Sequence, residues 1–130
     1  MSESHVKPGL IYTKEHEWLV VDGNVAVVGI TDYAQAALGD LVYVDLPAIG
    51  KLAETGKDIA VVESCKAASD VYSPVAGKIV AVNDELKNAP ELINQSPYDQ
   101  GWIFKIELSN PDEIKSLLSE QQYRDLLAAA

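Results

Sequence analysis

Between Gly39 and Leu108 the chain alternates short runs of β-branched and aromatic residues with Gly, Pro and Asn, and this alternation limits the folds open to it. The runs are LVYVDL, DIAVVES, SDVYS, GKIVAV and GWIFKIEL. Val, Ile, Tyr and Phe favour extended strands, whereas Gly, Pro and Asn interrupt regular structure. With 48% hydrophobic residues the chain can also bury a core, which a disordered chain cannot do. The pattern predicts a mainly β domain built from short strands.

The two halves of this region are similar to each other. GDLVYVDL at 39–46 is similar to GKIVAVND at 77–84, and IAVVES at 59–64 is similar to IFKIEL at 103–108. Each half therefore forms a strand, a loop and a returning strand, which predicts a flattened barrel or sandwich with an approximate two-fold axis. Chance similarity among Val-rich strands would give the same likeness, so the residues alone leave both interpretations open.

Further strands are predicted before this region. They cover residues 10–12, 18–21 and 25–30. The turn between the last two is Asp22-Gly23-Asn24, in which Gly and Asn accept a positive φ angle at little cost. The polar segment 1–9 is expected to be a flexible N-terminus. Residues 10–130 are expected to form a single domain with a helical tail at 111–128.

Capping residues mark the predicted helices. TDYAQAALG is expected to form a short helix that Thr31 or Asp32 caps and that Gly39 ends in the left-handed conformation. In the tail, Pro111 stands at a first helical position, with acidic residues beside the positive helix end. Ser119-Glu120-Gln121-Gln122 then has the spacing of a capping box that opens a second helix. The apolar faces of both helices are expected to pack on the barrel.

The charge of the chain excludes several classes of partner. A net charge of -10 at pH 7 repels nucleic acid and anionic membranes and favours partners with basic faces. A single cysteine cannot form an internal disulfide, and no apolar run is long enough to cross a bilayer. The start, MSESHVKPG, lacks both the apolar core of a secretory signal and the Arg-rich pattern of a transit peptide. We expect a monomeric cytoplasmic protein that binds neither nucleic acid nor membrane.

The segment VVESCKAASDVYSP, residues 61–74, places Cys65 and Lys66 side by side between two predicted strands. Most lysines are simply solvated side chains. Lys66 differs because its neighbours are small, so a modifying enzyme could approach the backbone without obstruction. The flanking strands would hold the tip rigid, and Pro74 fixes the exit. Such a hairpin suits a covalent attachment point and suits a buried active site poorly.

Catalytic and metal-binding patterns are scarce by comparison. A nucleophile pair of Cys65 and His16 is conceivable, but nothing in the sequence brings the two together. In Glu15-His16-Glu17 the two acids would share one face of a strand while the histidine points to the other, which makes a poor chelate. The chain has no Walker loop and no dinucleotide-binding fingerprint. An enzyme with its own active site is therefore not the favoured interpretation.

The segment VVESCKAASDVYSPVAGKIVAVN resembles the attachment hairpin of lipoyl and biotinyl domains, and most closely that of the glycine cleavage system H-protein family. The resemblance extends in order from about Leu10 to Leu127. It includes YTKEHEW, VGITDYAQAALGDLVYVDLP, PELIN and SPYDQGWIFKIE. Co-linear matching over nearly the whole chain is far more specific than any single motif.

The resemblance implies a barrel-sandwich hybrid fold with lipoic acid amide-linked to Lys66, and a shuttle rather than an enzyme. A glycine decarboxylase (P protein) would load an aminomethyl group onto the oxidised arm. An aminomethyltransferase (T protein) would take the methylene carbon, and dihydrolipoamide dehydrogenase (L protein) would reoxidise the dithiol. Lipoyl-attaching enzymes would add the arm. A lipoyl-carrying regulator or scaffold outside glycine cleavage is the alternative that stays open.

Two acids match positions that approach the loaded arm in this family. They are Glu17, in the HEW segment, and Asp70, just past the hairpin tip. The aminomethyl group is cationic and labile to water, so a carboxylate in a sheltered cleft would hold and protect it. A solvated acid among the 20 acidic residues of the chain is the plainer interpretation of each.

Cys65 departs from the family pattern, in which an aliphatic residue, commonly Val, precedes the lysine. The spacing is unaffected, but a free thiol then lies beside a dithiol-bearing arm. Biotin carriers of the superfamily favour methionines around their lysine. Here the neighbours are Cys65 and Ala67, which weakens the biotin alternative.

Overall fold

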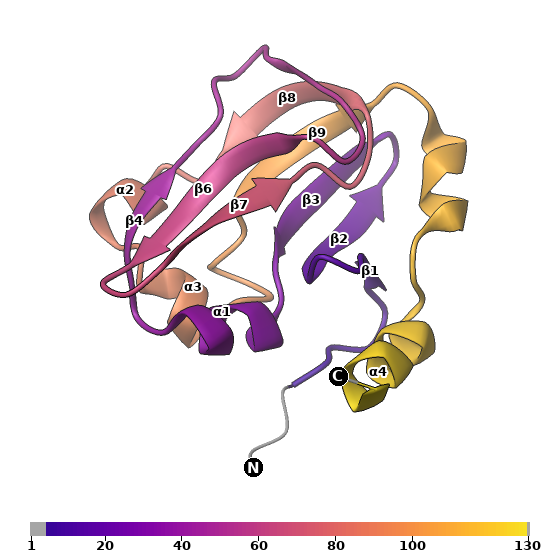
Figure 1. The fold of residues 1–130 in the computed structure, drawn as a ribbon. Coiled ribbons are helices and arrows are strands. Elements are labelled where there is room, and N and C mark those ends of the chain that lie inside the picture. The colour runs from indigo at the N-terminus through magenta and orange to yellow at the C-terminus, as the bar shows by residue number, and fades with distance from the viewer. Residues whose placement is uncertain (1–4, 130) are drawn as a thin grey trace.

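A computed structural model describes residues 5–129 of the 130-residue chain, and two antiparallel sheets form its body (Figure 1). The larger sheet has the order β1 (Ile11–Tyr12), β2 (Glu17–Asp22), β3 (Val25–Ile30), β9 (Phe104–Leu108), β8 (Gly77–Val82) and β5 (Leu52–Ala53). The smaller sheet has the order β4 (Leu41–Asp45), β6 (Asp58–Ser64) and β7 (Ala68–Tyr72). The predicted mainly β, barrel-sandwich architecture is confirmed.

The two similar halves of the sequence form similar strand pairs. In the first half, segments 39–46 and 59–64 form β4 and β6, which pair antiparallel. In the second half, segments 77–84 and 103–108 form β8 and β9, which also pair antiparallel. Each pair contains one register irregularity, between Leu41 and Tyr43 in the first and between Ile79 and Ala81 in the second. The internal likeness of the sequence therefore corresponds to a repeated structural unit.

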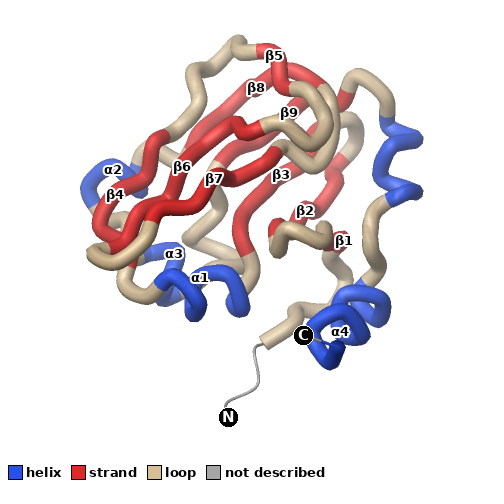
Figure 2. Tube along the Cα trace, viewed as in Figure 1, coloured by secondary structure: helices blue, strands red, loops and turns tan. Residues whose placement is uncertain are grey.

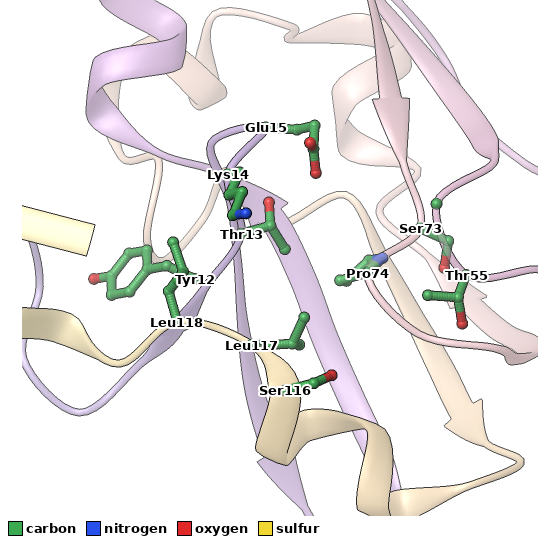
Figure 3. Close-up of a pocket in the computed structure, with 11 residues that line it drawn as sticks. Tyr12, Thr13, Lys14, Glu15, Thr55, Ser73, Pro74, Ser116, Leu117 and Leu118 are labelled. Carbon is green, nitrogen blue, oxygen red and sulfur yellow. The ribbon is translucent and has the colours of Figure 1, made fainter. Parts of the chain in front are cut away.

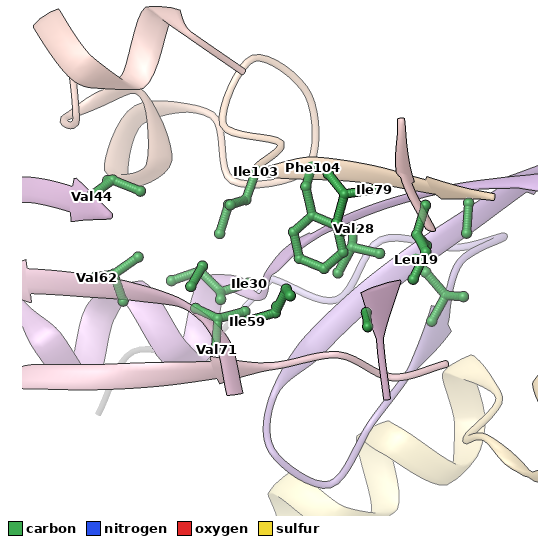
Figure 4. Close-up of a cluster of buried hydrophobic side chains, with 14 of the residues drawn as sticks. Leu19, Val28, Ile30, Val44, Ile59, Val62, Val71, Ile79, Ile103 and Phe104 are labelled. Carbon is green, nitrogen blue, oxygen red and sulfur yellow. The ribbon is translucent and has the colours of Figure 1, made fainter. Parts of the chain in front are cut away.

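The core lies between the two sheets (Figure 4). In the larger sheet, alternate residues of neighbouring strands share a register row, as in the pairings Val28↔Phe104 and Ala26↔Ile106. Side chains at every second position of a strand point to the same face, so these rows present one apolar surface. The smaller sheet contributes buried residues to the same cluster: Val44, Ile59, Val62 and Val71. This packing fixes the hairpin formed by β6 and β7 on the body of the protein.

Helix α1 (Asp32–Leu38) connects β3 to β4. Of its two candidate caps, Thr31 is the one used, because its Oγ1 accepts a hydrogen bond from Ala34 N at 3.3 Å. Gly39 ends the helix with φ 88° and ψ -165°. The prediction of a left-handed Gly39 is therefore wrong in ψ, although the positive φ still favours glycine.

The tail forms a 3-10 helix η1 (Pro111–Ser116) and then helix α4 (Glu120–Ala129). Asn110 accepts a hydrogen bond from Asp112 N and so caps the first of these. The capping box is confirmed in both directions, because Gln122 N donates to Ser119 Oγ and Ser119 N donates to Gln122 Oε1. Figure 2 shows α4 beside the N-terminal segment, away from the other α-helices.

Two further helices, α2 (Glu85–Asn88) and α3 (Leu92–Gln95), lie in the connection between β8 and β9. Each contributes one buried residue to the core, Leu86 and Ile93 respectively. Figure 1 shows α1, α2 and α3 gathered at the end of the molecule toward which the turn between β6 and β7 points. These helices therefore close that end of the space between the sheets.

Part of the predicted flexible N-terminus packs against the body. Residues 1–4 lie outside the described residues. Among the described residues of this segment, Val6 is buried, and its carbonyl accepts a hydrogen bond from Arg124 Nη2 at 2.9 Å. Asp32 Oδ2 accepts a hydrogen bond from His5 N at 2.8 Å. Segment 5–9 thus connects α1 to α4.

Candidate functional site

Lys66 lies in the exposed turn between β6 and β7 (Figure 1). The turn is closed by Ser64, whose N donates to Ala67 O at 2.8 Å and whose Oγ accepts from Ala67 N at 3.2 Å. Lys66 N also donates to Ser64 Oγ, at 3.4 Å. The backbone of Lys66 is thereby held while its side chain is open to solvent, as the sequence predicts. Cys65 is exposed beside it.

The aliphatic stem of Lys66 lies against the end of helix α1. A Cβ atom placed on Gly39 would be 3.3 Å from Lys66 Cε and 3.7 Å from Lys66 Nζ. Since Gly39 also has a positive φ, this position favours glycine for both conformation and space. The sequence indicated Gly39 only as a helix end, and its role beside the lysine emerges from the fold.

The outward face of the small sheet is acidic. Asp45 pairs with Val61, which pairs with Asp70, so these three residues form one row across the sheet. In the row nearer the turn, Glu63 lies between Tyr43 and Ala68. The described strands β4, β6 and β7 contain no Lys or Arg. Lys66 therefore stands at the border of a negatively charged surface.

Glu17 lies at the other end of β7 and is 1% exposed. Its Oε1 accepts a hydrogen bond from Thr13 Oγ1 at 2.8 Å, and its Oε2 accepts one from Tyr72 N at 3.1 Å. Burial raises the pKa of the Glu17 carboxyl to about 7, although both hydrogen bonds favour the ionised form. The side chain thus connects the turn before β2 to the edge of the small sheet.

Asp70 lies between these two residues along β7 and is exposed. At about 3.3 Å per strand residue, the path from Ala68 to Tyr72 is roughly 13 Å. Lys66, Asp70 and Glu17 therefore follow one another along the edge strand of the small sheet. The fold brings the predicted site residues into one line, without placing them in direct contact.

The conceivable pairing of Cys65 with His16 is not formed. His16 Nδ1 is hydrogen-bonded to Tyr123 Oη at 2.8 Å, and burial lowers the pKa of the His16 ring. Within residues 5–129 no hydrogen bond joins His16 to Cys65. Among the same residues, no group of His, Cys, Asp or Glu has a metal-binding arrangement. No described helix has the length and apolar character that a membrane crossing requires.

A cavity of about 180 Å³ lies beside the turn that contains Thr13 and Glu15 (Figure 3). It opens between the turn before β2, the connection between β5 and β6, and the segment before α4. Its lining includes Thr13, Glu15, Ser73, Pro74 and Leu117. Thr13 thus contacts both this cavity and the Glu17 carboxylate. Thr13 was not identified from the sequence, although this residue lies four positions before Glu17, in the segment between two predicted strands.

Known proteins are similar to this chain over nearly its whole length. Residues 10–130 match the sequence model of the family described as Glycine cleavage H-protein. A glycine cleavage system H protein of Xanthobacter autotrophicus is 56% identical over 116 residues, covering 89% of this chain and 93% of that protein. One of Carboxydothermus hydrogenoformans is 50% identical over 124 residues and 95% of both chains.

A solved structure shows the same fold. The crystal structure of a glycine cleavage system H protein from Mycobacterium marinum superposes with a TM-score of 0.87 at 33% identity. The match covers 95% of this chain and 99% of that one. The family match, the relatives and the fold all indicate the same family. The chain belongs to the glycine cleavage H-protein family, the lipoyl-bearing shuttles of the glycine cleavage system.

Proposed function

We propose that lipoic acid is amide-linked to Lys66 Nζ and that the protein is a carrier without catalytic activity of its own. The observation that carries this proposal is the hairpin turn, in which Ser64 holds the backbone and the lysine amine is exposed. Lys78, by contrast, lies within strand β8. Lys14 is also exposed in a hairpin turn, between β1 and β2, but its neighbours Thr13 and Glu15 are larger than those of Lys66. An attaching enzyme needs an accessible amine on a rigid support, and Lys66 provides both.

The lipoyl arm serves glycine decarboxylase (P protein), aminomethyltransferase (T protein) and dihydrolipoamide dehydrogenase (L protein) in turn. A flexible tether on a rigid tip presents its dithiol to each docked partner at a high effective concentration. The acidic face beside Lys66 favours partners with basic surroundings at their active-site entrances. Electrostatic attraction of this kind speeds the encounter more than it tightens the complex, which suits a carrier that must leave again.

Reconstituted glycine cleavage tests the carrier role. Lipoylated protein is expected to support release of labelled carbon dioxide from glycine by the decarboxylase, and unlipoylated protein is not. Lys66→Arg cannot carry the arm, because a guanidinium does not form the amide, and should be inactive. Lys78→Arg is the matched control and should support full turnover. An active Lys66→Arg protein would exclude this lysine as the attachment site.

We further propose that the aminomethyl-loaded arm lies along β7, past Asp70, toward Glu17. The loaded amine is cationic, so a carboxylate at the end of this path would hold it by a charge-assisted hydrogen bond. Glu17 already accepts two hydrogen bonds, but an ionised carboxylate has further lone pairs to offer. Because Glu17 is only 1% exposed, a docked amine would displace its neighbours slightly. Asp70 is open to solvent and offers the alternative contact.

Spontaneous decay of the loaded protein, without aminomethyltransferase, tests the docked arm. Glu17→Ala is expected to release formaldehyde and ammonia faster than the wild type, while its lipoylation is unchanged. A contact of roughly 1.5–3 kcal/mol corresponds to an acceleration of at least about tenfold. Glu107→Ala removes an exposed acid from the larger sheet and is the matched control. If Glu17→Ala decays like the wild type and Asp70→Ala decays faster, Asp70 is the receiving group.

A further inference from the structure

The hydroxyl of Tyr123, on helix α4, is buried at a junction of three elements. Tyr123 is 0% exposed, and its ring stacks on Tyr12 with the centroids 4.6 Å apart. Its Oη lies 2.7 Å from Thr31 Oγ1 and 2.8 Å from His16 Nδ1. One hydroxyl group thus connects α4 to the cap of α1 and to the turn that precedes β2.

The first partner, Thr31, belongs to the element that reaches Lys66. Thr31 caps α1, and Gly39, at the other end of this seven-residue helix, lies against the lysine stem. A bond that fixes Thr31 therefore fixes the start of a short helix whose end contacts the attachment residue. Helix α1 forms one side of the region between Lys66 and the turn before β2.

The second partner, His16, directly precedes Glu17. His16 has a φ of 69°, which is uncommon for a residue with a side chain. Its N donates to Thr13 O at 3.2 Å, and its carbonyl accepts from Thr31 N at 2.9 Å. Its ring also contacts Tyr33, with the ring centroids 4.5 Å apart. Such a conformation persists only where the surroundings hold it, and Tyr123 supplies the hydrogen bond to the ring.

The hydrogen bonds at this junction can be satisfied in two ways. In the first, Thr31 Oγ1 donates to Tyr123 Oη, which donates to His16 Nδ1. In the second, His16 Nδ1–H donates to Tyr123 Oη, which donates to Thr31 Oγ1. Both are compatible with a neutral imidazole, and Thr31 Oγ1 can accept from Ala34 N in either arrangement. The Tyr123 oxygen bridges the two side chains in both cases, in addition to the backbone hydrogen bond from Thr31 N to His16 O.

We infer that Tyr123 is a positioning residue for the loaded arm: its hydroxyl fixes the side chains of Thr31 and His16, and with them the cap of α1 and the conformation of the turn before Glu17. The inference rests on the proposed docking of the arm toward Glu17. Loss of the hydroxyl leaves the helix, the aromatic stack and both carboxylates in place. It removes the side-chain bridge that fixes the orientation of the His16 ring and of the Thr31 cap, while the backbone hydrogen bond between these two residues stays.

The test compares Tyr123→Phe with Tyr12→Phe. The second variant also loses a buried tyrosine hydroxyl, but one that donates to Lys7 O and contacts neither Thr31 nor His16. Both rings keep their mutual stacking. Loaded Tyr123→Phe is expected to decay roughly fivefold faster than the wild type, the factor that one lost hydrogen bond gives. Tyr12→Phe is expected to decay at the wild-type rate, at a temperature where circular dichroism shows all proteins folded.

A second readout reports the junction itself. The ¹⁵N chemical shift of His16 Nδ1 is expected to change in Tyr123→Phe and to stay unchanged in Tyr12→Phe. If Tyr123→Phe does not fold, Thr31→Val removes one half of the bridge, with Thr31→Ser as its control. Thr31→Val should then decay faster than Thr31→Ser.

Several outcomes would overturn the inference. One is equal decay of Tyr123→Phe and the wild type, and another is equal acceleration in both tyrosine variants, which would indicate general loosening. Glu17→Ala, measured in parallel, separates the two proposals. If Glu17→Ala decays faster and Tyr123→Phe does not, only the positioning role fails. If Glu17→Ala and Asp70→Ala both decay like the wild type, the docked arm itself is refuted.

Discussion

Replacing Glu17 by Gln should change how the stability of the protein depends on pH. Burial raises the pKa of this carboxyl from 4.5 to about 7. At about 1.36 kcal/mol per pKa unit, the difference amounts to ~3 kcal/mol. The folded state binds a proton at Glu17 more tightly than the unfolded state does. This contribution to stability is therefore fully present below about pH 4.5 and is lost as the pH rises through about 7. Gln has a similar shape and no proton to lose.

The assay is urea unfolding of the wild type and Glu17→Gln between pH 4 and pH 8, with both proteins unlipoylated. The free energy of unfolding of the wild type minus that of the variant should fall by up to ~3 kcal/mol across this range. The pKa of His16 is lowered by burial, which acts on stability in the opposite direction. His16 is present in both proteins, so its effect largely cancels in the difference. Glu107→Gln, an exposed substitution in the larger sheet, is the control.

The outcome decides between two opposing effects on one carboxylate. Burial favours the protonated form, whereas the hydrogen bonds from Thr13 and Tyr72 favour the ionised form. A stability difference that is flat, or that rises with pH, would show that the hydrogen bonds prevail. Glu17 would then be an ordinary ionised acid, and the reasoning from its burial would be refuted.

Three further predictions concern the hairpin and the sheet beneath it. Gly39→Ala adds a methyl group 3.3 Å from Lys66 Cε, at a residue with a positive φ. It should lower the free energy of unfolding by about 1–2 kcal/mol and slow lipoylation. Unchanged attachment kinetics would show that the lysine stem does not need this contact. Cys65→Val should keep full carrier activity in the reconstituted system while abolishing any mixed disulfide with the reduced arm, as mass spectrometry under oxidising conditions can show. A large loss of glycine cleavage would instead make the thiol functional. Gly77→Ala would place a Cβ in collision with the backbone carbonyl oxygen of Glu107 in the neighbouring strand. Its free energy of unfolding in urea should therefore fall by more than about 2 kcal/mol, against less than about 0.5 kcal/mol for Lys78→Ala.

The long strands could be predicted because their residues carry a strong local signal. Val-rich runs flanked by Gly or Pro became β4, β6 and β8 within one residue of their expected bounds. Strand β5, with two residues, and helices α2 and α3, with four each, were missed. Elements this short have no periodicity of their own and form because the rest of the fold holds them.

Burial at the site could not be predicted in the same way. Glu17, Trp18 and Leu19 are all buried, which breaks the alternation expected of a strand with one solvated face. The cause is tertiary, because Trp18 belongs to a second buried cluster that includes Val6 and Tyr123. An acid directly before a predicted strand is therefore a buried carboxylate in the structure. Its partners Thr13 and Tyr72 come from segments that lie far apart in the sequence.

The tail shows the limit of helical patterns. Pro111 and the acidic residues after it predicted a first helix in the tail, and the segment forms a 3-10 helix that ends at Ser116. The capping box at Ser119 fixed the start of α4 correctly. Periodicity could indicate that α4 packs on the barrel. It could not show that the Tyr123 hydroxyl would join Thr31 and His16, since that depends on where three separate elements meet.

Peptide mass mapping after co-expression with a lipoyl-attaching enzyme tests the central claim most directly. The wild type and Lys78→Arg are each expected to gain one lipoyl group, located on the peptide that contains Cys65 and Lys66. Lys66→Arg is expected to keep its unmodified mass. A lipoyl group found on Lys66→Arg, or on any other lysine of the wild type, would contradict the account.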